Sequence, residues 1–413
     1  MELKSILFIG FVWPEASSSA AGSRMMQLIG YFQALGAKVT FASAANPGEH
    51  PSDLEAIGVT TVPIALNHSS FDNFIIALNP TVVVFDRYMT EEQFGWRVAA
   101  HCPDCVRILD TEDLHSLRAV RQQCVKDDLQ LTNDLLLGNE LSKRELASIF
   151  RSDLSLIISE FEMELLKELY GVSTDLLCYL PLVVEAKASE NVEWESKKDF
   201  VFIGNFIHAP NWDAVLNLKN NIWPLIHQKL PGVKLHIYGA YASARVNQLH
   251  NEQSGFLVHG WAERASTVFE SARICLAPLR FGAGIKGKLL ETMYYGTPNV
   301  TTSIGAEGIQ GEMPWGGAVE DSWELFSMAA VQLYNDKAFW EQSQKNGYAI
   351  LRERFDKKVH FNAFISRLQH VLSHLKNNRN KNFIGGMLMQ QTTAASKYMA
   401  KWIEAKNKSN PKP

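Results

Sequence analysis

Short apolar runs alternate with longer amphipathic stretches along most of the chain. In the first half, five apolar runs bounded by turn residues predict β-strands at residues 6–10, 38–42, 81–86, 106–110 and 154–159. The segments between them, such as 23–35 and 91–100, have apolar residues at helical spacing. Strands that alternate with helices predict βαβ units and a parallel sheet. Residues 81–85, Thr-Val-Val-Val-Phe, are apolar at consecutive positions, as expected of a strand covered on both faces.

The same alternation restarts in the second half of the chain. It predicts strands at residues 199–204, 233–239, 256–258, 274–277 and 299–302. Residues 185–198 are charged and lack apolar periodicity, which predicts an interdomain linker. Two parallel α/β units leave a cleft between them, at the carboxyl ends of their strands, where open α/β sheets bind ligands.

Helical segments complete this organisation. Residues 117–149 predict a long helical segment with a break near Gly138 and Asn139. The chain is mostly helical after about residue 321, and we expect residues 355–375 to pack back across the first domain.

Composition narrows the class of protein. With 413 residues the chain has room for two or three domains, and a net charge of -4 argues against a nucleic-acid binder. Five cysteines are an odd, sparse set, which favours a reducing cytoplasm over a disulfide framework. Cys102 and Cys105 have the spacing of a metal or redox pair, but no second pair follows, so buried thiols are the simpler interpretation.

Targeting signals do not change the cytoplasmic expectation. Residues 3–10 predict a first strand and not a secretory signal, and no apolar run approaches the roughly 20 residues of a membrane span. Residues 376–413 contain eight Lys or Arg residues and one acid, with scattered apolar side chains. Two interpretations stay open for this tail: a basic amphipathic helix in peripheral contact with the inner membrane face, and a solvated end.

The most informative stretch is residues 277–302, APLRFGAGIKGKLLETMYYGTPNVTT. A predicted strand ends at its start, a glycine-rich loop follows, and a helix begins near Gly287. Glycines let the backbone approach a ligand, and a helix N-terminus offers free N–H groups to an anion. Arg280, Lys286 and Lys288 add positive charge for a diphosphate. Glu291 lies one helical turn beyond Lys288, where it would accept hydrogen bonds from ribose hydroxyls.

This stretch also resembles a known family. Residues 282–298, followed by Thr-Thr-Ser-Ile-Gly-Ala-Glu-Gly at 301–308, look like the donor motif of retaining glycosyltransferases with the GT-B fold, group 1 or family 4. Residues 199–213, DFVFIGNFIHAPNWD, are similar to the opening of that family's donor domain. The resemblance covers residues 199–309.

The resemblance implies an α/β protein of two Rossmann-like domains whose parallel sheets face a central cleft. The expected parts are an acceptor-binding domain at 1–185, a donor-binding domain at 199–345, helices at 346–375 that cross back, and a basic tail at 376–413. It further implies a hexosyltransferase-like enzyme of glycan biosynthesis that works with retention, without a metal or cofactor. The donor would be a UDP- or GDP-sugar, and the acceptor a glycan, a lipid or another molecule.

Site residues follow by matching positions. The expected donor site comprises Gly204, Asn205, His208, Gly284, Ile285, Lys286, Glu291 and Glu307. Lys288 and Arg280 would neutralise the departing diphosphate, and His115, after the strand at 106–110, would act at the reacting centre. Gly22 and Arg24 would lie in a loop that faces phosphate and acceptor.

Plainer interpretations of single residues stay open. His115 could cap a loop, His208 could shape a turn, Arg24 could be a surface helix residue, and Glu307 could be an ordinary loop acid.

The sequence departs from the family pattern in one respect that matters. The family has two glutamates eight positions apart; Glu291 fits the second, but the first position is Ala283. The usual Arg and Lys pair after Gly204 is also missing, and Arg280, Lys286 and Lys288 would replace its charge. Two alternatives to a transferase therefore remain: a non-catalytic module that binds nucleotide-sugar or glycan, and a nucleotide-sugar epimerase.

Overall fold

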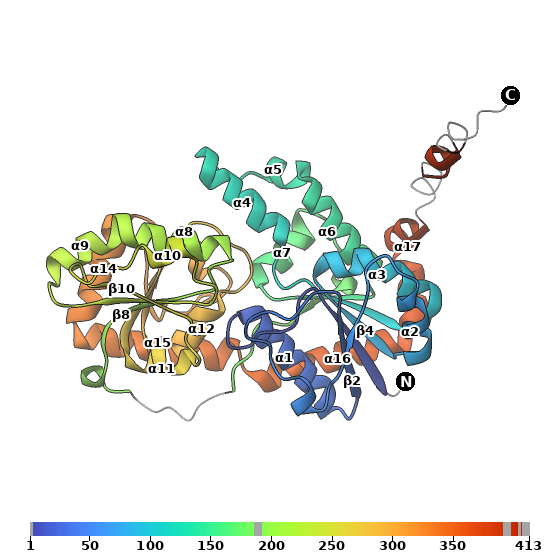
Figure 1. The fold of residues 1–413 in the computed structure, drawn as a ribbon, viewed down its shortest axis with the longest axis horizontal. Helices are drawn as coiled ribbons and strands as arrows, with labels where there is room; N and C mark the ends of the chain where they lie inside the picture. The colour runs from blue at the N-terminus through green and yellow to red at the C-terminus, as the bar shows by residue number, and fades with distance from the viewer. Residues whose placement is uncertain (1–2, 186–191, 391–397, 404–405, 407–413) are drawn as a thin grey trace.

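The chain folds into two lobes, each built around a twisted parallel sheet (Figure 1). The structure is a computed structural model that describes residues 3–185, 192–390, 398–403 and 406. The first lobe contains the N-terminal strands and the second the strands after residue 198. This is the expected two-domain α/β architecture.

The first sheet has seven parallel strands in the order β3-β2-β1-β4-β5-β6-β7. Its strands are β1 (Ser5–Gly10), β2 (Lys38–Ser43), β3 (Thr60–Pro63), β4 (Val82–Asp86), β5 (Val106–Asp110), β6 (Leu154–Ile157) and β7 (Leu177–Tyr179). The two edge strands β3 and β7 were not expected from the sequence. They have only four and three residues, too few to show a hydrophobic period.

The helices of the first domain cover both faces of this sheet. They are α1 (Ala20–Ala34), η1 (Glu55–Ile57), α2 (Ser70–Leu78), α3 (Arg87–His101), α4 (His115–Asp127), α5 (Asn133–Gly138), α6 (Glu140–Arg151), α7 (Glu160–Glu168) and η2 (Thr174–Leu176). The expected break near Gly138 is present, but the segment is also interrupted earlier. Asp128 adopts a left-handed conformation (φ 53°) that ends α4, and Thr132 caps α5 by accepting from the N–H of Leu135.

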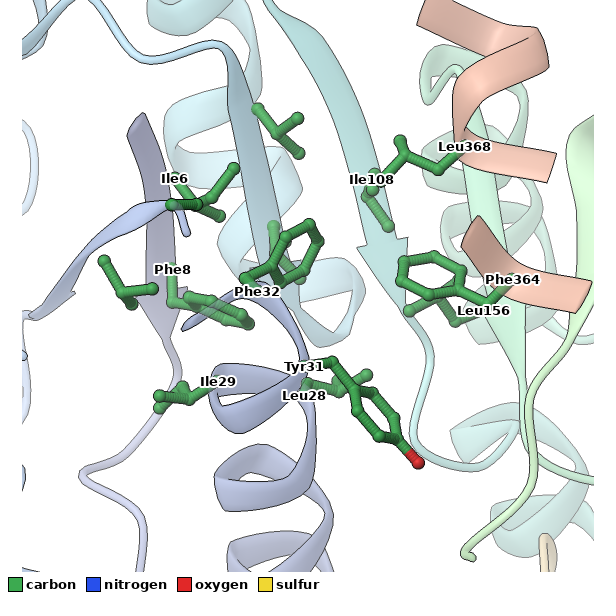
Figure 2. Packing of buried hydrophobic residues seen from close by; sticks show 14 of the residues in the cluster. Ile6, Phe8, Leu28, Ile29, Tyr31, Phe32, Ile108, Leu156, Phe364 and Leu368 are labelled. Carbon is green, nitrogen blue, oxygen red and sulfur yellow. The ribbon is translucent and has the colours of Figure 1, made fainter. Parts of the chain in front are cut away.

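Residues on each central strand alternate between two cores. Ile6 and Phe8 pack on one face of the sheet, whereas Leu7 and Ile9 pack on the other. The first face is covered by α1 and by α16 (Lys357–Lys381), which returns from the C-terminal end of the chain (Figure 2). Phe364 of α16 meets Phe32 of α1 edge to face at 5.9 Å between ring centres. The expectation that C-terminal helices cross back is confirmed.

The second sheet has six parallel strands in the order β10-β9-β8-β11-β12-β13. Its strands are β8 (Lys198–Ile203), β9 (Leu235–Tyr238), β10 (Phe256–Gly260), β11 (Ala272–Ala277), β12 (Asn299–Thr301) and β13 (Gly317–Val319). The helices that follow β7 are η3 (Trp194–Ser196), α8 (Ala209–Asn217), the π-helix η4 (Leu218–Ile222), α9 (Trp223–Lys229), α10 (Ala244–Asn247), α11 (Ala265–Ser271), α12 (Gly287–Tyr294), α13 (Ser303–Ala306), α14 (Trp323–Asn335), α15 (Lys337–Arg354), α16 and α17 (Phe383–Gln390).

Several expectations concern segments beyond the two sheets. Residues 186–191 of the expected linker, and much of the basic tail after residue 390, lie outside the described residues. Cys102 and Cys105 are buried free thiols whose pKa burial raises, as the simpler interpretation expected. Within the described ranges, none of the helices is both long and apolar enough to cross a membrane.

Candidate active site

A cleft of about 650 Å³ lies between the carboxyl ends of the two sheets. We call the cleft residues from positions 11 to 158 the first wall and those from 203 to 291 the second wall. Behind the cleft, an apolar cluster joins the domains, with Ile158 and Leu182 from the first and Ile285 and Leu289 from the second. The cleft is therefore a joint product of both domains.

The second wall is formed by the glycine-rich loop and the first turn of α12. Gly284 has φ 61°, and a Cβ atom there would lie 2.8 Å from the Cβ of Asp113 on the first wall. Only a glycine fits this conformation and this contact, because L-residues with side chains disfavour positive φ. The loop thus passes within touching distance of the opposite domain.

Lys288 is the central cation of the second wall. Its Nζ donates to Oδ1 of Asn211 at 2.7 Å and lies 4.2 Å from the centre of the Phe202 ring. Burial lowers the pKa of Lys288 to about 8. A Cβ atom at Gly204 would lie 2.8 Å from this Nζ, so the glycine leaves room for the lysine. The charge of Lys288 is held by a neutral amide and an aromatic face, which leaves it available to an anion.

Two further groups accompany Lys288 on this wall. Glu291 lines the cleft, and burial raises its pKa to about 7 in spite of the opposing charge of Lys288. Lys286 donates from Nζ to the carbonyl of Gly284 at 2.9 Å, and burial lowers its pKa to about 8. A carboxyl and two amines that titrate near neutrality suit recognition of a polar, anionic ligand.

Two histidines face each other across the cleft. His115 begins α4 on the first wall and His208 caps α8 on the second, and both line the cleft. Burial lowers the pKa of each to about 4, so both imidazoles are neutral at pH 7. His115 Nε2 lies 3.5 Å from Oδ1 of Asp113, which also forms an ion pair with Arg118. Burial alone would raise the pKa of Asp113, but the charge of Arg118 outweighs it and lowers the pKa of this carboxyl.

Polar contacts fix the glycine-rich loop to the first domain. Arg121 of α4 donates to both carboxyl oxygens of Glu307, at 2.8 and 2.7 Å, and to the carbonyl of Gly282 at 2.8 Å. Glu162 of α7 accepts from the N–H of Gly284 at 2.8 Å and from that of Leu114 at 3.0 Å. The Leu114 bond lies within the first domain, whereas the Arg121 bonds and the Glu162–Gly284 bond cross the domain boundary. The packing of the two domains therefore sets the position of the loop.

The structure brings most of the expected residues to the cleft. Those that line it are Gly22, His115, Gly204, Asn205, His208, Gly284, Ile285, Lys286, Lys288 and Glu291. Gly22 lies in the first turn of α1, where a Cβ atom would meet the carbonyl oxygen of Glu15 at 2.3 Å. The loop and the first-domain turns therefore converge on one site.

Three expected residues are placed elsewhere. Arg24 is 1% exposed and donates hydrogen bonds to Asp110 and to the carbonyl of Leu180. It is therefore one partner of a buried structural ion pair, and neither a phosphate ligand nor a surface residue. Arg280 is paired with Asp213, with Nε to Oδ2 at 2.9 Å, and is not among the cleft residues. Glu307 also lies outside the cleft lining, in the clamp with Arg121. In each case the charge is already matched by a partner from a distant segment.

Sequence reasoning missed several residues of the first wall. Asp86, Arg87, Glu112, Asp113 and Arg118 all line the cleft. The only local signal was that Asp86 and Glu112 follow buried strands, at the edge where ligands bind. Asn211 belongs to this site as well, because its side chain bonds to Lys288 and to the carbonyl of Asn205.

Comparisons with known proteins agree with this architecture. Residues 197–336 match the profile of the family described as "Glycosyl transferases group 1". Sucrose-phosphate synthase from Thermosynechococcus elongatus is similar in structure, with a TM-score of 0.66 and 15% identity over 90% of this chain and 99% of that one. The Anabaena protein HepE, solved with UDP and glucose, has a TM-score of 0.63 and 10% identity over 89% of this chain and 100% of that one.

A curated relative is more similar in sequence. It is an uncharacterised 44.6 kDa protein of the cps region of Klebsiella pneumoniae, 22% identical over 170 residues. The matched stretch spans 40% of this chain and 44% of that relative.

The fold and the cleft define the class of protein. Two Rossmann-like domains that face each other, with a C-terminal helix crossing back, make this a GT-B protein. Its second domain contains the stretch, residues 197–336, that matches the group 1 glycosyl transferases.

Proposed function

We propose that the chain transfers a hexose-like sugar from a nucleoside diphosphate sugar, linked to UDP or GDP, to a hydroxyl group of a glycan or lipid acceptor. The observation that carries the proposal is Lys288 at the first turn of α12, held in the cleft by the amide of Asn211 and one turn from Glu291. A lysine, a helix N-terminus and a carboxylate in this order suit a diphosphate followed by a ribose. The group 1 family domain and the UDP bound by the Anabaena relative support the same donor class.

In the proposed reaction, Glu291 accepts hydrogen bonds from the ribose, and Lys288 with Lys286 faces the diphosphate. The bond between the anomeric carbon and the phosphate oxygen breaks, and the bond to the acceptor oxygen forms on the same face, which gives retention. The acceptor proton moves to the departing phosphate oxygen. Lys286 and Lys288 offset the negative charge that develops on this oxygen, a form of electrostatic stabilisation that needs no metal ion. The Arg121–Glu307 clamp keeps the loop closed and so excludes water.

Calorimetric titration with UDP and GDP tests the donor site. We expect one of the two nucleotides to bind, and Lys288→Ala to weaken it roughly 10- to 100-fold, the effect of losing one charged hydrogen bond. Lys219→Ala is the matched control, because Lys219 also lies over an aromatic ring, at 4.6 Å from the centre of Phe256, but outside the cleft. If the Lys288→Ala variant bound nucleotide with the same affinity as the Lys219→Ala variant, the role given to Lys288 would be wrong.

Turnover separates the transferase from the alternatives. A panel of nucleotide-sugars, with chelator present, should show release of nucleotide and a product whose anomeric configuration by NMR equals that of the donor. Binding without turnover of any donor would identify a non-catalytic module. Turnover that yields an isomerised nucleotide-sugar would identify an epimerase, and activity that depends on an added divalent metal would contradict the role of the lysines.

A further inference from the structure

The first wall contains two carboxyl groups that the proposed donor chemistry does not use. Asp86 and Glu112 are 4% and 8% exposed, and both line the cleft. Oδ1 of Asp86 and Oε1 of Glu112 are buried without a hydrogen-bond partner among the described residues. A buried carboxyl oxygen without a donor is costly, so such atoms in a cleft indicate a ligand that donates hydrogen bonds.

The fold brings these two groups to the ends of neighbouring strands. Asp86 ends β4 and Glu112 lies two residues after β5, and these neighbouring strands pair in register so that Asp86 is opposite Asp110. The second oxygen of Asp86 accepts from the N–H of Phe11 at 2.9 Å and from Arg87 at 3.3 Å. The orientation of this carboxyl is therefore fixed: Oδ2 accepts two hydrogen bonds, and Oδ1 accepts none from the described residues.

The backbone beside both acids is strained. Arg87 has φ 68° and Glu112 has φ 61°, a left-handed region that costs non-glycine residues roughly 1–2 kcal/mol. Both residues line the cleft: Arg87 directly follows Asp86, and Glu112 is itself one of the two acids. The left-handed conformation of these two residues turns the chain at the ends of β4 and β5, and polar side chains reach the cleft as a result.

The charges of the first wall indicate what it binds. Its carboxyl groups are those of Glu15, Asp86, Glu112 and Asp113, and its cations are only Arg87 and Arg118. Both arginines are already paired, Arg87 with Asp86 and Arg118 with Asp113. A phosphate on this wall would face excess negative charge, whereas hydroxyl groups would supply the missing donors.

We propose that Asp86 and Glu112 form the acceptor subsite, and that they bind a neutral sugar or polyol through two adjacent hydroxyl groups and disfavour acceptors that carry a phosphate there. This proposal rests on the proposed transferase function and names its acceptor class. A sugar has adjacent hydroxyl groups that can each donate a hydrogen bond, and hydrogen bonds from hydroxyls to ionised carboxyls are strong. Burial raises the pKa of Glu112 to about 8 and also raises that of Asp86, so the pair can keep one proton and both donate and accept.

The test is binding of small acceptors to the nucleotide-loaded protein. Wild type saturated with UDP, or with GDP if calorimetry selects it, is titrated with the methyl glycosides of glucose, galactose and mannose. The same sugars with a phosphate in place of one hydroxyl form the second arm. We expect at least one neutral glycoside to bind, each phosphorylated counterpart to bind about tenfold more weakly, and Asp86→Asn and Glu112→Gln to weaken the neutral glycoside roughly tenfold.

Matched measurements keep the result interpretable. Glu164→Gln, an exposed carboxyl of α7 paired with Lys167, is the control and should bind the glycoside as wild type does. Both cleft variants should keep wild-type affinity for the nucleotide, which shows that they are folded. If no neutral glycoside binds, if phosphorylated sugars bind better, or if both variants bind the glycoside as wild type does, the acceptor proposal is overturned. Failure of nucleotide to bind to wild type would instead overturn the proposed donor site.

Discussion

The two walls of the cleft hold their charges in different ways. On the second wall, the lysines donate hydrogen bonds to neutral groups: Lys288 to the side-chain amide of Asn211, and Lys286 to the carbonyl of Gly284. On the first wall, each arginine faces a carboxylate, and carboxyl oxygens remain without donors. The second wall therefore has cations ready for an anion, and the first has acceptors ready for hydroxyl groups.

This difference suggests a division of labour between the domains. A donor diphosphate needs positive charge at the point where negative charge develops, and a lysine without an acidic partner provides it. An acceptor hydroxyl needs an orienting hydrogen bond, and a carboxyl provides that. Since the clamp between Arg121 and Glu307 sets how the walls meet, closure places donor and acceptor together.

The largest expected effect comes from the ion pair beneath the first wall. Arg24→Leu would leave Asp110 buried and uncompensated, and loss of one partner of such a pair costs about 3–5 kcal/mol of unfolding free energy. Chemical denaturation followed by tryptophan fluorescence measures this loss in the first transition. Nucleotide affinity of the folded variant should stay within about twofold of wild type, because Arg24 does not line the cleft.

The control for this variant is Arg97→Leu. Arg97 pairs with Asp72 at 2.7 Å, and because these side chains are 12% and 23% exposed, we expect a smaller loss than for the fully buried pair of Arg24 and Asp110. If Arg24→Leu kept its stability but lost nucleotide binding, the phosphate-contact hypothesis drawn from the sequence would be right and the structural interpretation wrong.

The contact between the walls is tested by Gly284→Ala. The new Cβ would lie 2.8 Å from the Cβ of Asp113, and the backbone has φ 61°, so the loop must move away from Glu162. We expect kcat to fall about 10- to 100-fold, because displacement of catalytic groups by about an ångström has effects of this size. Gly260→Ala is the control, since Gly260 has φ 76° but open space where its Cβ would be. Equal losses in both variants would attribute the effect to backbone strain alone.

The second wall was predictable because its chemistry lies on one continuous segment. Lys286, Lys288 and Glu291 are separated by two and three residues, and the turn between β11 and α12 that brings them together is local. Helix periodicity and glycine placement therefore predicted that these side chains lie together, and they do line one cleft; their role in nucleotide binding stays a prediction. In each sheet consecutive strands are neighbours on both sides of one break, between β1 and β4 in the first sheet and between β8 and β11 in the second.

The first wall could not be predicted in the same way. Its acids come from segments as far apart as Glu15 and Asp113, and only the packing of three strand ends, those of β1, β4 and β5, brings them together. Arg24 shows the limit most clearly. Its place at the start of a helix beside a glycine loop was compatible with a phosphate contact, but its partner Asp110 lies 86 residues away and decides its role. A sequence pattern shows which charges are present, but not which of them are already neutralised.

The pH dependence of donor binding tests the second wall by itself. Glu291 must be ionised to accept hydrogen bonds from ribose, so affinity is full above its pKa of about 7 and falls as the pH drops below it. Lys288 must be charged to bind the diphosphate, so affinity is full below its pKa of about 8 and falls as the pH rises above it. Calorimetry with a nucleotide-sugar should show strongest binding between pH 7 and 8 and, on each side, a loss of up to about tenfold per pH unit.

A single variant assigns the acid limb of this pH profile to its titrating group. Glu291→Gln cannot titrate and should flatten the acid limb, with the alkaline limb retained. An acid limb that persisted in Glu291→Gln would assign the titration to another group and contradict the ribose role of Glu291.

Arg280→Ala has the smallest expected effect and sharpens the comparison of the walls most directly. Arg280 and Lys288 are both cations in the segment that follows β11, and no sequence pattern distinguishes the cation that has a carboxylate partner from the one that has none. In the structure Arg280 is partly exposed and bound to Asp213, whereas Lys288 lies in the cleft. An exposed pair contributes about 1 kcal/mol or less, so kcat/KM and nucleotide affinity should change by less than about threefold. A loss in kcat/KM as large as that of Lys288→Ala would mean that Arg280 leaves Asp213 when the donor binds, and the second wall would then gain a third cation only in the closed, occupied state.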